Sequence, residues 1–387
     1  MEKLIVLIAV VIFSACSADK EEFVCVSEKY ENNQSYRVEK EEALEIANMV
    51  VGKSSTRINS EITNFEYVIR DKSITRFEKN ACSDTLAYII NYPNEEGFAI
   101  IASDKRVYPI LAYSDKGSFS LSNEVSKVNF IDGIEGYMEK NCSVNTSNID
   151  VDEEELDNCR MIFPTINISL HQDAPYNKFV VKEYPDCPVG CVAVATALVM
   201  MHSIPGMNYH DSRFYFTRMR EVISNNNGRL NSPQKIVGAG YLNETYTYDQ
   251  AIDSIAKILY WIGKDVGMNY SPSGSGANSY MAYTLIRHLN FDVVLGYENY
   301  NIESMLEYLE DNCIIYMRGT AVSGGGHAWV CDGGSYCISD STGITNAFIH
   351  CDWGWGGVSN GYYSGDVFDA IYYEFEPENY FAVKRHI

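Results

Sequence analysis

Apolar and polar residues are arranged in two different ways along the chain. In the first part, a helical stripe of apolar residues runs through Val38–Val51, because these residues recur every three or four positions. Two β-rich runs, Leu86–Tyr92 and Gly97–Ser103, flank a Pro-Asn-Glu-Glu turn, which predicts a hairpin. A further strand is predicted at Ile110–Tyr113 and a further helix at Ile131–Glu139. This part of the chain is therefore predicted to be a small α+β unit.

The second part of the chain begins helical and ends in strands. An apolar run over Gly190–Met201 is preceded by prolines and followed by Pro205, which predicts one buried helix. Two more helices are predicted at residues 249–263 and 279–290. A helical half followed by a β half predicts the α+β class. The β half consists of short runs separated by glycine-rich turns: Cys313–Arg318, His327–Asp332, Ala347–Asp352 and Tyr380–Val383.

A dense acidic segment separates the two parts. Six of the eight residues of Asp150–Asp157 are acidic, and like charges at that density repel one another and resist packing. The segment is either a solvated loop or an exposed linker that a protease can cut. Both interpretations place a boundary at residues 150–165, with one domain over residues 16–150 and another over residues 165–387.

The N-terminus has the pattern of an export signal. A basic residue, the apolar run Leu4–Phe13 and two small residues lead to Cys16, so residues 1–15 are predicted to be a signal peptide. The run is too short to cross a bilayer, which needs roughly 20 residues. The Phe-Ser-Ala-Cys ending resembles a bacterial lipobox, which would make Cys16 the lipidated first residue of the mature chain. An ordinary signal peptide that contains a cysteine is the alternative.

Composition narrows the functional classes. The 387 residues are 46% hydrophobic and 21% charged, which is enough apolar material for packed cores and excludes a mainly disordered chain. The formal net charge is −22, and no cluster of Lys and Arg is present to bind a phosphate backbone, so nucleic acid is not an expected partner. Eleven cysteines in an exported chain allow disulfides, but their pairing cannot be deduced from spacing.

Two residues point to nucleophilic chemistry. Cys191 stands at the start of the predicted buried helix, where the partial positive charge of the helix end favours a thiolate. His327 follows a glycine-rich turn at the head of a predicted strand, in the cysteine-then-histidine order of papain-like enzymes. Each residue alone also fits a structural role. Together they predict a thiol nucleophile and its general base.

Three further residues complete the predicted site. Asp352 could accept a hydrogen bond from His327, and Trp353 could shield that contact from water; aromatic packing beside a turn is the alternative for this block. A developing oxyanion needs two donors, for which the backbone N–H of Cys191 and the side chain of Gln172 are the candidates. No metal or organic cofactor is required for this chemistry.

Taken together, these motifs resemble the streptopain family of secreted papain-like cysteine peptidases, peptidase family C10. The family's helix motif with the nucleophile is matched at Gly190–Ala197, and its motif with the general base at Gly326–Val330. Its Trp-Gly-Trp-Gly-Gly block is matched at Trp353–Gly357, and its motif with the oxyanion-hole glutamine at Gln172–Asn177. The resemblance implies a papain-like catalytic domain and a cysteine-type endopeptidase.

The resemblance also implies how the chain is processed and which class of substrate it cuts. It implies that residues 16–150 contain a prodomain that covers the cleft, keeps the enzyme latent and is removed by cleavage within residues 150–165. It implies that Ser275 and Gly326 contact bound peptide, and that the substrates are host or environmental proteins with an apolar residue two positions before the cut bond. The acidic stretch after Cys16 is similar to that of surface lipoproteins of Bacteroidota. We therefore expect an outer-membrane lipoprotein at the cell surface, with release of the catalytic domain after cleavage.

Two residues depart from the family pattern. Asp352 stands where streptopain has Asn, which leaves the pH range of activity open. Cys187 lies near Cys191 in the sequence, and a disulfide between them would silence the nucleophile, whereas a free or differently paired Cys187 would not.

Two other functions remain open at this point. A metal site could draw on Cys331, Cys337, His350 and Cys351, although the spacing lacks a paired Cys-x-x-Cys arrangement and adjacent residues of a strand face opposite sides. The chain could also be a catalytically inactive surface binding protein built on a peptidase fold.

Overall fold

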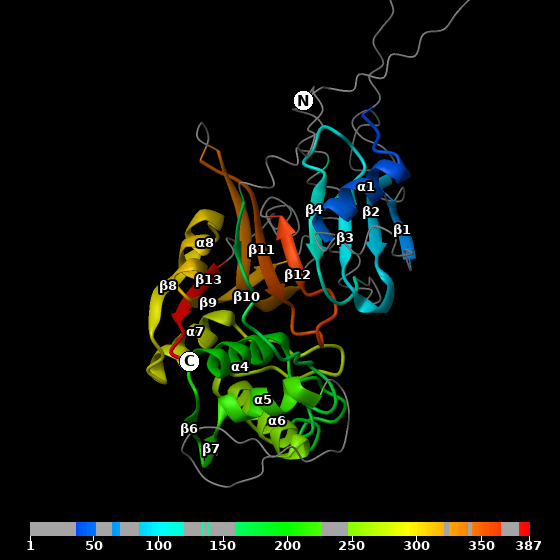
Figure 1. The fold of residues 1–387 in the computed structure, drawn as a ribbon. Helices are drawn as coiled ribbons and strands as arrows, with labels where there is room; N and C mark the ends of the chain where they lie inside the picture. Colours follow the sequence, from blue (N-terminus) through cyan, green and yellow to red (C-terminus); the bar gives the residue numbers. More distant parts are fainter. Residues whose placement is uncertain are drawn as a thin grey trace, which may run out of the picture. The chain divides into compact units, whose positions relative to one another are not determined.

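The structure is a computed structural model, drawn in Figure 1. It describes residues 36–51, 64–69, 85–119, 159–226, 247–320, 325–339, 343–364 and 379–387, together with Ile134 and Met138. The predicted signal peptide, Cys16, the acidic segment and most of the helix predicted at Ile131–Glu139 lie outside these residues. Among the described residues, none of the helices has the length and apolar character needed to span a membrane.

A four-stranded antiparallel sheet with one helix on it forms the first part of the described chain. The helix buries Ala43 and Ala47 against alternate residues of two strands, among them Tyr88 and Ile101, because side chains of a strand point alternately to its two faces. The helix, hairpin and third strand predicted from the sequence are confirmed. The elements are α1 (Lys40–Val51), β1 (Asn64–Ile69), β2 (Thr85–Asn91), β3 (Phe98–Ala102) and β4 (Ile110–Ser114).

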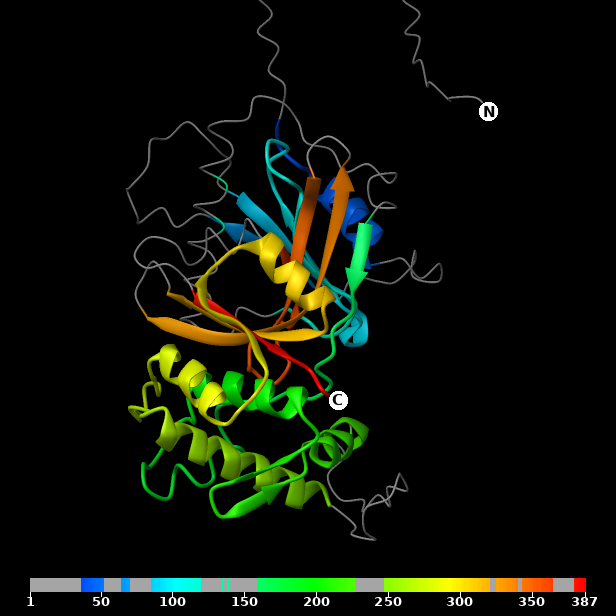
Figure 2. The same ribbon diagram turned by 90° about the vertical axis from the view of Figure 1, so that its left-hand side faces the viewer.

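Helices dominate the middle of the chain, where Figure 2 shows them gathered in one layer beside the sheet. The three predicted helices are confirmed as α4, α6 and α7, and α5 is a further one. α4 has no polar face, and every residue after Cys191 is buried, as expected of a helix that is apolar all round. The elements are α4 (Cys191–Ser203), β6 (Met207–Tyr209), β7 (Ser212–Phe214), α5 (Phe216–Asn226), α6 (Tyr248–Asp265) and α7 (Ser279–His288).

An antiparallel sheet forms the last part of the chain. All four predicted β runs are confirmed, and the second and third extend into the two long strands of one hairpin, β10 and β11. The neighbouring strands follow the order β12-β11-β10-β9-β13-β8, and α4 packs against β9 and β10. The elements are β8 (Val293–Asn299), α8 (Ile302–Glu310), β9 (Cys313–Thr320), β10 (Gly326–Ser339), β11 (Gly343–Asp352), β12 (Gly361–Ser364) and β13 (Asn379–Lys384).

The N-terminal sheet and the C-terminal sheet are continuous. β4 pairs with β12 in antiparallel register, with Tyr113 opposite Tyr362. The two tyrosine rings stack at a centroid distance of 5.1 Å, and the hydroxyl of Tyr113 lies 3.0 Å from Oγ of Ser335 in β10. Because backbone pairing and side-chain contacts coincide here, the first unit is attached to the second by a strand edge.

The end of the predicted linker is part of the folded structure. Residues 150–158 lie outside the described chain, but Cys159–Ile162 form strand β5, which pairs with β10. Just beyond it, the backbone amides of Thr165 and Ile166 donate to one carboxylate oxygen of Asp332, at 2.7 and 2.6 Å. The C-terminal end of the range 150–165, which is predicted to be the linker, is thus paired with the edge of β10.

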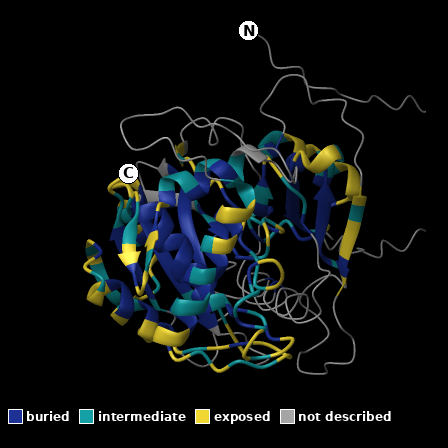
Figure 3. Ribbon diagram, turned by 90° about the horizontal axis from the view of Figure 1, so that it is seen from below, coloured by how far each residue is buried: buried dark blue, intermediate teal, exposed yellow. Residues whose placement is uncertain are grey.

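Two apolar clusters lie on the two faces of β10. Figure 3 shows that the interior of the fold is mostly buried, with exposed residues toward its outside. Trp329 and Cys331 point into one cluster, which also holds residues of β2 and β3. Ala328 and Val330 point into the other, which contains α4. The strand that begins with the predicted general base is thus fixed from both sides.

Asp332 offers a test of how firmly the segment after the linker is held. Its side chain is buried, and its other oxygen lies 2.7 Å from Nδ1 of His350. Burial alone would raise the pKa of Asp332, but His350 and the two backbone amides outweigh it and lower the pKa.

We expect Asp332→Ala to reduce the free energy of unfolding by about 3–5 kcal/mol, because three partly buried donors lose a fully buried acceptor. Urea unfolding measures this difference. The difference should be largest above the ordinary pKa of an aspartate, and it should decrease as the pH falls from there through the lower pKa that Asp332 has in the folded state. The matched control is Asp292→Ala, whose ion pair with His386 is exposed and should contribute about 0–1 kcal/mol. An equal effect of the two substitutions would contradict the conclusion that Asp332 holds the segment after the linker in place.

Candidate active site

The nucleophile candidate lies at the first residue of α4. Gly190 precedes it with a φ of 87°, a left-handed conformation that favours glycine. A Cβ at Gly190 would also lie 2.7 Å from the sulfur of Met268 and 2.9 Å from the carbonyl oxygen of Ser275. The sharp turn before the helix therefore requires glycine, and it sets the direction in which the Cys191 thiol enters the site.

The Cys191 thiol is free, half-buried and neutral in this conformation. Burial raises its pKa, although backbone groups of Ala328, Val192 and Cys191 itself act in the opposite direction. The helix end was expected to favour the thiolate, and burial outweighs that effect here. Cys187 is also free, and its thiol donates to the carbonyl of Pro185 at 3.4 Å, so the inactivating disulfide with Cys191 is not formed.

His327, at the start of β10, is surrounded by indole rings. Its ring centroid lies 4.9 Å from that of Trp355, 6.0 Å from Trp329 and 6.2 Å from Trp353. Burial lowers the pKa of His327 to about 4, so the imidazole is neutral near pH 7. Trp353 was predicted to shield the His327 contact from water. Trp355 lies closer to the imidazole than Trp353 does. The second tryptophan of the Trp-Gly-Trp motif is the sequence signal that could have identified it.

The hydrogen bond that orients His327 comes from the backbone. Nε2 lies 3.0 Å from the carbonyl oxygen of Trp353. Because a carbonyl oxygen can only accept, Nε2 must carry the hydrogen, and Nδ1 of the neutral ring is left as the acceptor. This tautomer is the one that a general base requires.

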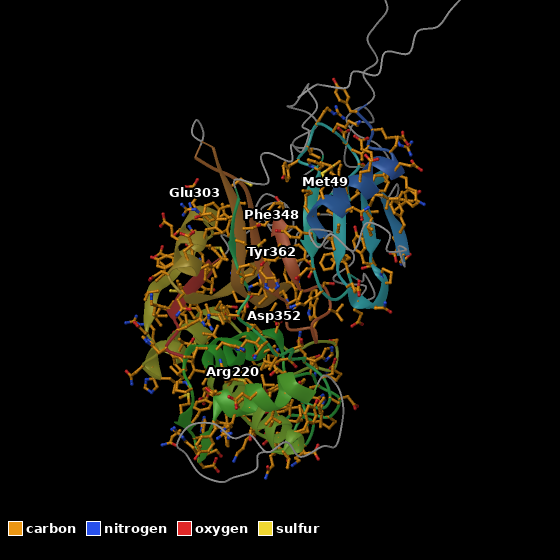
Figure 4. All side chains as sticks on the ribbon, in the orientation of Figure 1. Met49, Arg220, Glu303, Phe348, Asp352 and Tyr362 are labelled. Carbon is orange, nitrogen blue, oxygen red and sulfur yellow. The ribbon has the colours of Figure 1, made fainter. Side chains whose placement is uncertain are left out.

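Asp352 does not contact His327 directly, which corrects the prediction from the sequence. Its carboxyl accepts from the backbone N–H of Gly354 at 2.9 Å and interacts with Asn360. The Trp353–Gly354 peptide thus donates to Asp352 while its carbonyl accepts from His327, so Asp352 acts through that peptide. Burial raises the pKa of Asp352 to about 6. Figure 4 shows Asp352 where the sheet meets the helical layer.

The predicted oxyanion-hole segment is held beside the nucleophile by backbone pairing. The carbonyl of Gln172 accepts from Val189 at 2.8 Å, and that of Leu170 accepts from Gly356 at 2.8 Å. Gly354 in turn lies against α4, because a Cβ there would meet a methyl carbon of Val194 at 2.7 Å. The segments with Gln172, Cys191, His327 and Trp353, which are far apart in the sequence, therefore converge on the start of α4.

The two residues expected to contact peptide differ in accessibility. Gly326 is exposed at the first position of β10. Ser275 is buried, and its hydroxyl donates to the carbonyl of Pro188 at 2.7 Å. The Ser275 side chain therefore fastens the loop of residues 269–276 to the turn before Cys191.

Cys191 and His327 are not joined by a hydrogen bond in the described part of the chain. The thiol and the imidazole lie in neighbouring segments. The pKa of Cys191 is raised and that of His327 is lowered, and both shifts favour the neutral forms over the ion pair. A thiolate–imidazolium pair would require a hydrogen bond between the Cys191 sulfur and Nδ1 of His327, which this conformation does not contain.

The residues considered as metal ligands do not gather in one place. Cys331 and Cys351 face each other in an apolar cluster, while His350 is bonded to Asp332. Cys337 is disulfide-bonded. No group of three metal-ligating side chains occurs within the described ranges.

Comparison with known proteins agrees with this geometry. Residues 170–363 match the model of the Peptidase C10 family, and residues 35–132 match that of the Spi protease inhibitor. Streptopain of Streptococcus pyogenes is 26% identical over 302 residues, which cover 70% of this chain and 72% of that protein. The thiol protease/hemagglutinin PrtT of Porphyromonas gingivalis is 22% identical over 318 residues, which cover 72% of this chain and 33% of that protein.

A solved structure shares the fold. A fragment of prointerpain A from Prevotella intermedia superposes with a TM-score of 0.50 at 18% identity, covering 78% of this chain and 96% of that one. The shared fold is papain-like, and the matches to the Peptidase C10 model and to streptopain define a cysteine-type endopeptidase. The match to the inhibitor model adds a prodomain that resembles Spi, as in a zymogen. The chain belongs to the peptidase C10 family.

We expect His327 to titrate near pH 4 in the intact Cys191→Ala chain, as followed by the NMR signals of its ring. Trp355→Ala should move the pKa up toward the ordinary 6.5, because removal of the nearest indole admits water. Trp261→Ala is the matched control, since that indole stacks on His210 instead, at 4.2 Å. An unchanged His327 titration in Trp355→Ala would contradict the burial argument.

Proposed function

We propose that the chain is an exported, lipid-anchored cysteine endopeptidase, made as a zymogen, that cuts protein and peptide substrates through a thioester acyl-enzyme. The observation that carries the proposal is the convergence of four motifs on the start of α4, with Nδ1 of His327 left as the proton acceptor. Cys16 is the proposed lipid attachment site, and the outer face of the outer membrane is the proposed location.

The proposed reaction uses one acid–base group twice. Nδ1 of His327 takes the proton of the Cys191 thiol, and the thiolate attacks the peptide carbonyl carbon. The side chain of Gln172 and the backbone N–H of Cys191 stabilise the negative oxygen. When the tetrahedral intermediate collapses, the C–N bond breaks and His327 protonates the leaving amine. Water, deprotonated by the same nitrogen, then hydrolyses the thioester and restores the thiol.

The proposed latency is supported by the state of the two catalytic groups. Cys191 and His327 are both neutral, and no hydrogen bond joins them to each other. In the same structure, β4 of the inhibitor-like region is paired with β12. β12 follows directly on the Trp353–Gly357 turn that orients His327. In the proposed activation, removal of the prodomain frees the edge of β12, and the turn and His327 move so that Nδ1 reaches the thiol.

An inactive binding protein on the same fold is the second candidate. The observation in its favour is the absence, among the described residues, of a hydrogen bond between Cys191 and His327. Labelling of the active-site thiol by a mechanism-based inhibitor separates the two candidates, because only a nucleophilic Cys191 reacts.

The first measurement is the intact mass of the chain after incubation with an epoxysuccinyl peptide under reducing conditions. Wild type should be converted from about the full-length mass of 43.6 kDa to a shorter catalytic fragment carrying one inhibitor. Cys191→Ala should do neither. Cys187→Ala is the matched control, since Cys187 is a free buried thiol near the site, and it should behave as wild type. If wild type does not shorten by itself, and stays unlabelled even after an added protease has cut it between residues 150 and 158, the inactive binding protein is favoured.

Gln172→Ala should lower kcat of the matured enzyme by about 10²–10³-fold with little change in KM, because one oxyanion donor is lost. Asp173→Ala replaces the exposed neighbour and should leave both constants within about twofold of wild type. Steady-state hydrolysis of a fluorogenic peptide measures both constants. A Gln172→Ala effect confined to KM would show that this side chain binds substrate in its ground state.

A further inference from the structure

Besides Cys187 and Cys191, a second pair of cysteines lies near the candidate active site. This pair has no part in the proposed reaction. Cys331 in β10 and Cys351 in β11 are directly opposite each other in the antiparallel register, and their sulfurs are 3.8 Å apart. Both residues are free thiols, with exposed fractions of 1% and 0%.

The geometry of the pair suits a covalent bond between the two sulfurs. Facing residues of antiparallel strands have Cβ atoms about 4.5–5.5 Å apart, and a disulfide requires about 3.5–4.5 Å with an S–S length of about 2.0 Å. A small approach of the strands and rotation of the side chains would close that gap. The ladder is irregular immediately after Cys331, where the register shifts before Gly333, so the strand has local freedom to adjust.

The surroundings of the pair favour a disulfide over a metal. Both thiols lie in the apolar cluster with Trp329 and Trp353. The polar side chains next to them in sequence, Asp332 and His350, are bonded to each other. Two thiols without further ligands do not make a zinc site, which needs four.

We propose that Cys331 and Cys351 form a disulfide when the chain folds in an oxidising compartment. Two S–H bonds break and one S–S bond forms; two protons leave, and two electrons pass to the disulfide of a thiol–disulfide oxidant. The inference depends on the proposed export of the chain in one respect only, namely the compartment in which this oxidation occurs.

Oxidation has to take place before the core closes. Exchange proceeds through a thiolate, and burial raises the pKa of Cys351 well above its ordinary value. The folded reduced form and the folded oxidised form should therefore interconvert slowly. Cys191, which is only half-buried, remains open to mild reductant, so the nucleophile can be reduced while the Cys331–Cys351 bond persists.

The bond would join the two strands that orient the general base. β10 begins beside His327, and β11 ends at Asp352, next to the peptide whose carbonyl accepts from His327. A link between Cys331 and Cys351 therefore fixes the distance between the imidazole and its acceptor.

The test is a map of thiols in the full chain after oxidative refolding with a mixture of reduced and oxidised glutathione. The protein is denatured in N-ethylmaleimide without reductant, digested and analysed by mass spectrometry. We expect a cross-linked peptide pair containing Cys331 and Cys351, two hydrogens lighter than the sum of the reduced peptides, and full alkylation of Cys313, a buried free cysteine that serves as the internal control. Alkylation of both Cys331 and Cys351, or a bond from either one to another cysteine, would overturn the proposal.

A second measurement keeps the proposal independent of peptidase activity. Refolding with reductant in place of the glutathione mixture should lower the Tm of wild type by several degrees more than that of the Cys331→Ala/Cys351→Ala double variant. The double variant corrects for Cys337, whose own disulfide also responds to reductant. Equal shifts in the two proteins would count against the bond. Peptidase activity is read separately on the same samples, so an inactive chain that forms the bond would refute the proposed function and leave this inference intact.

Discussion

The arrangement of the site depends on the burial of a helix that has no polar face. α4 must be enclosed on all sides, because exposure of any side of it would leave apolar surface in water. α5, α6 and α7 enclose it on one side, and β9 and β10 enclose it on the other. Its N-terminus therefore emerges where the helical layer meets the sheet. Cys191 is placed at this boundary, and segments from both layers can reach it.

The same burial determines the charge state of the two candidate catalytic groups, Cys191 and His327. Removing a thiol and an imidazole from water favours their neutral forms, so the pKa of Cys191 rises and that of His327 falls. A thiolate–imidazolium pair becomes favourable only if the two charges meet, because each charge must compensate for the lost hydration of the other. A conformation that holds them apart is therefore chemically inactive, and a small displacement is sufficient for latency. The attachment of the inhibitor-like region next to the turn that supports His327 fits that requirement.

The sequence predicted the parts of this structure that depend on local pattern. The prolines around an apolar run predicted the position of α4. Short β-rich runs next to turns predicted β2, β3 and β10. The nucleophile and base candidates followed from their positions at the ends of those elements. The orienting group for His327 was misassigned to the Asp352 side chain, because a backbone carbonyl has no residue signature and every residue has one. The pairing of β4 with β12 joins segments far apart in the sequence, so no local pattern could predict it. β5 was missed because its four residues pair only by virtue of the edge that β10 presents.

The hairpin of β10 and β11 explains how one short stretch of sequence serves several purposes. Side chains alternate between the faces of a strand, so residues next to each other in sequence belong to different environments. One face carries Trp329 and Cys331 into an apolar cluster, and the ring of His327 stacks with that of Trp329. Asp332 stands at the irregularity in the ladder, where its carboxylate reaches the segment after the linker and His350. The strand that bears the proposed general base thus also holds the segment that follows the predicted linker.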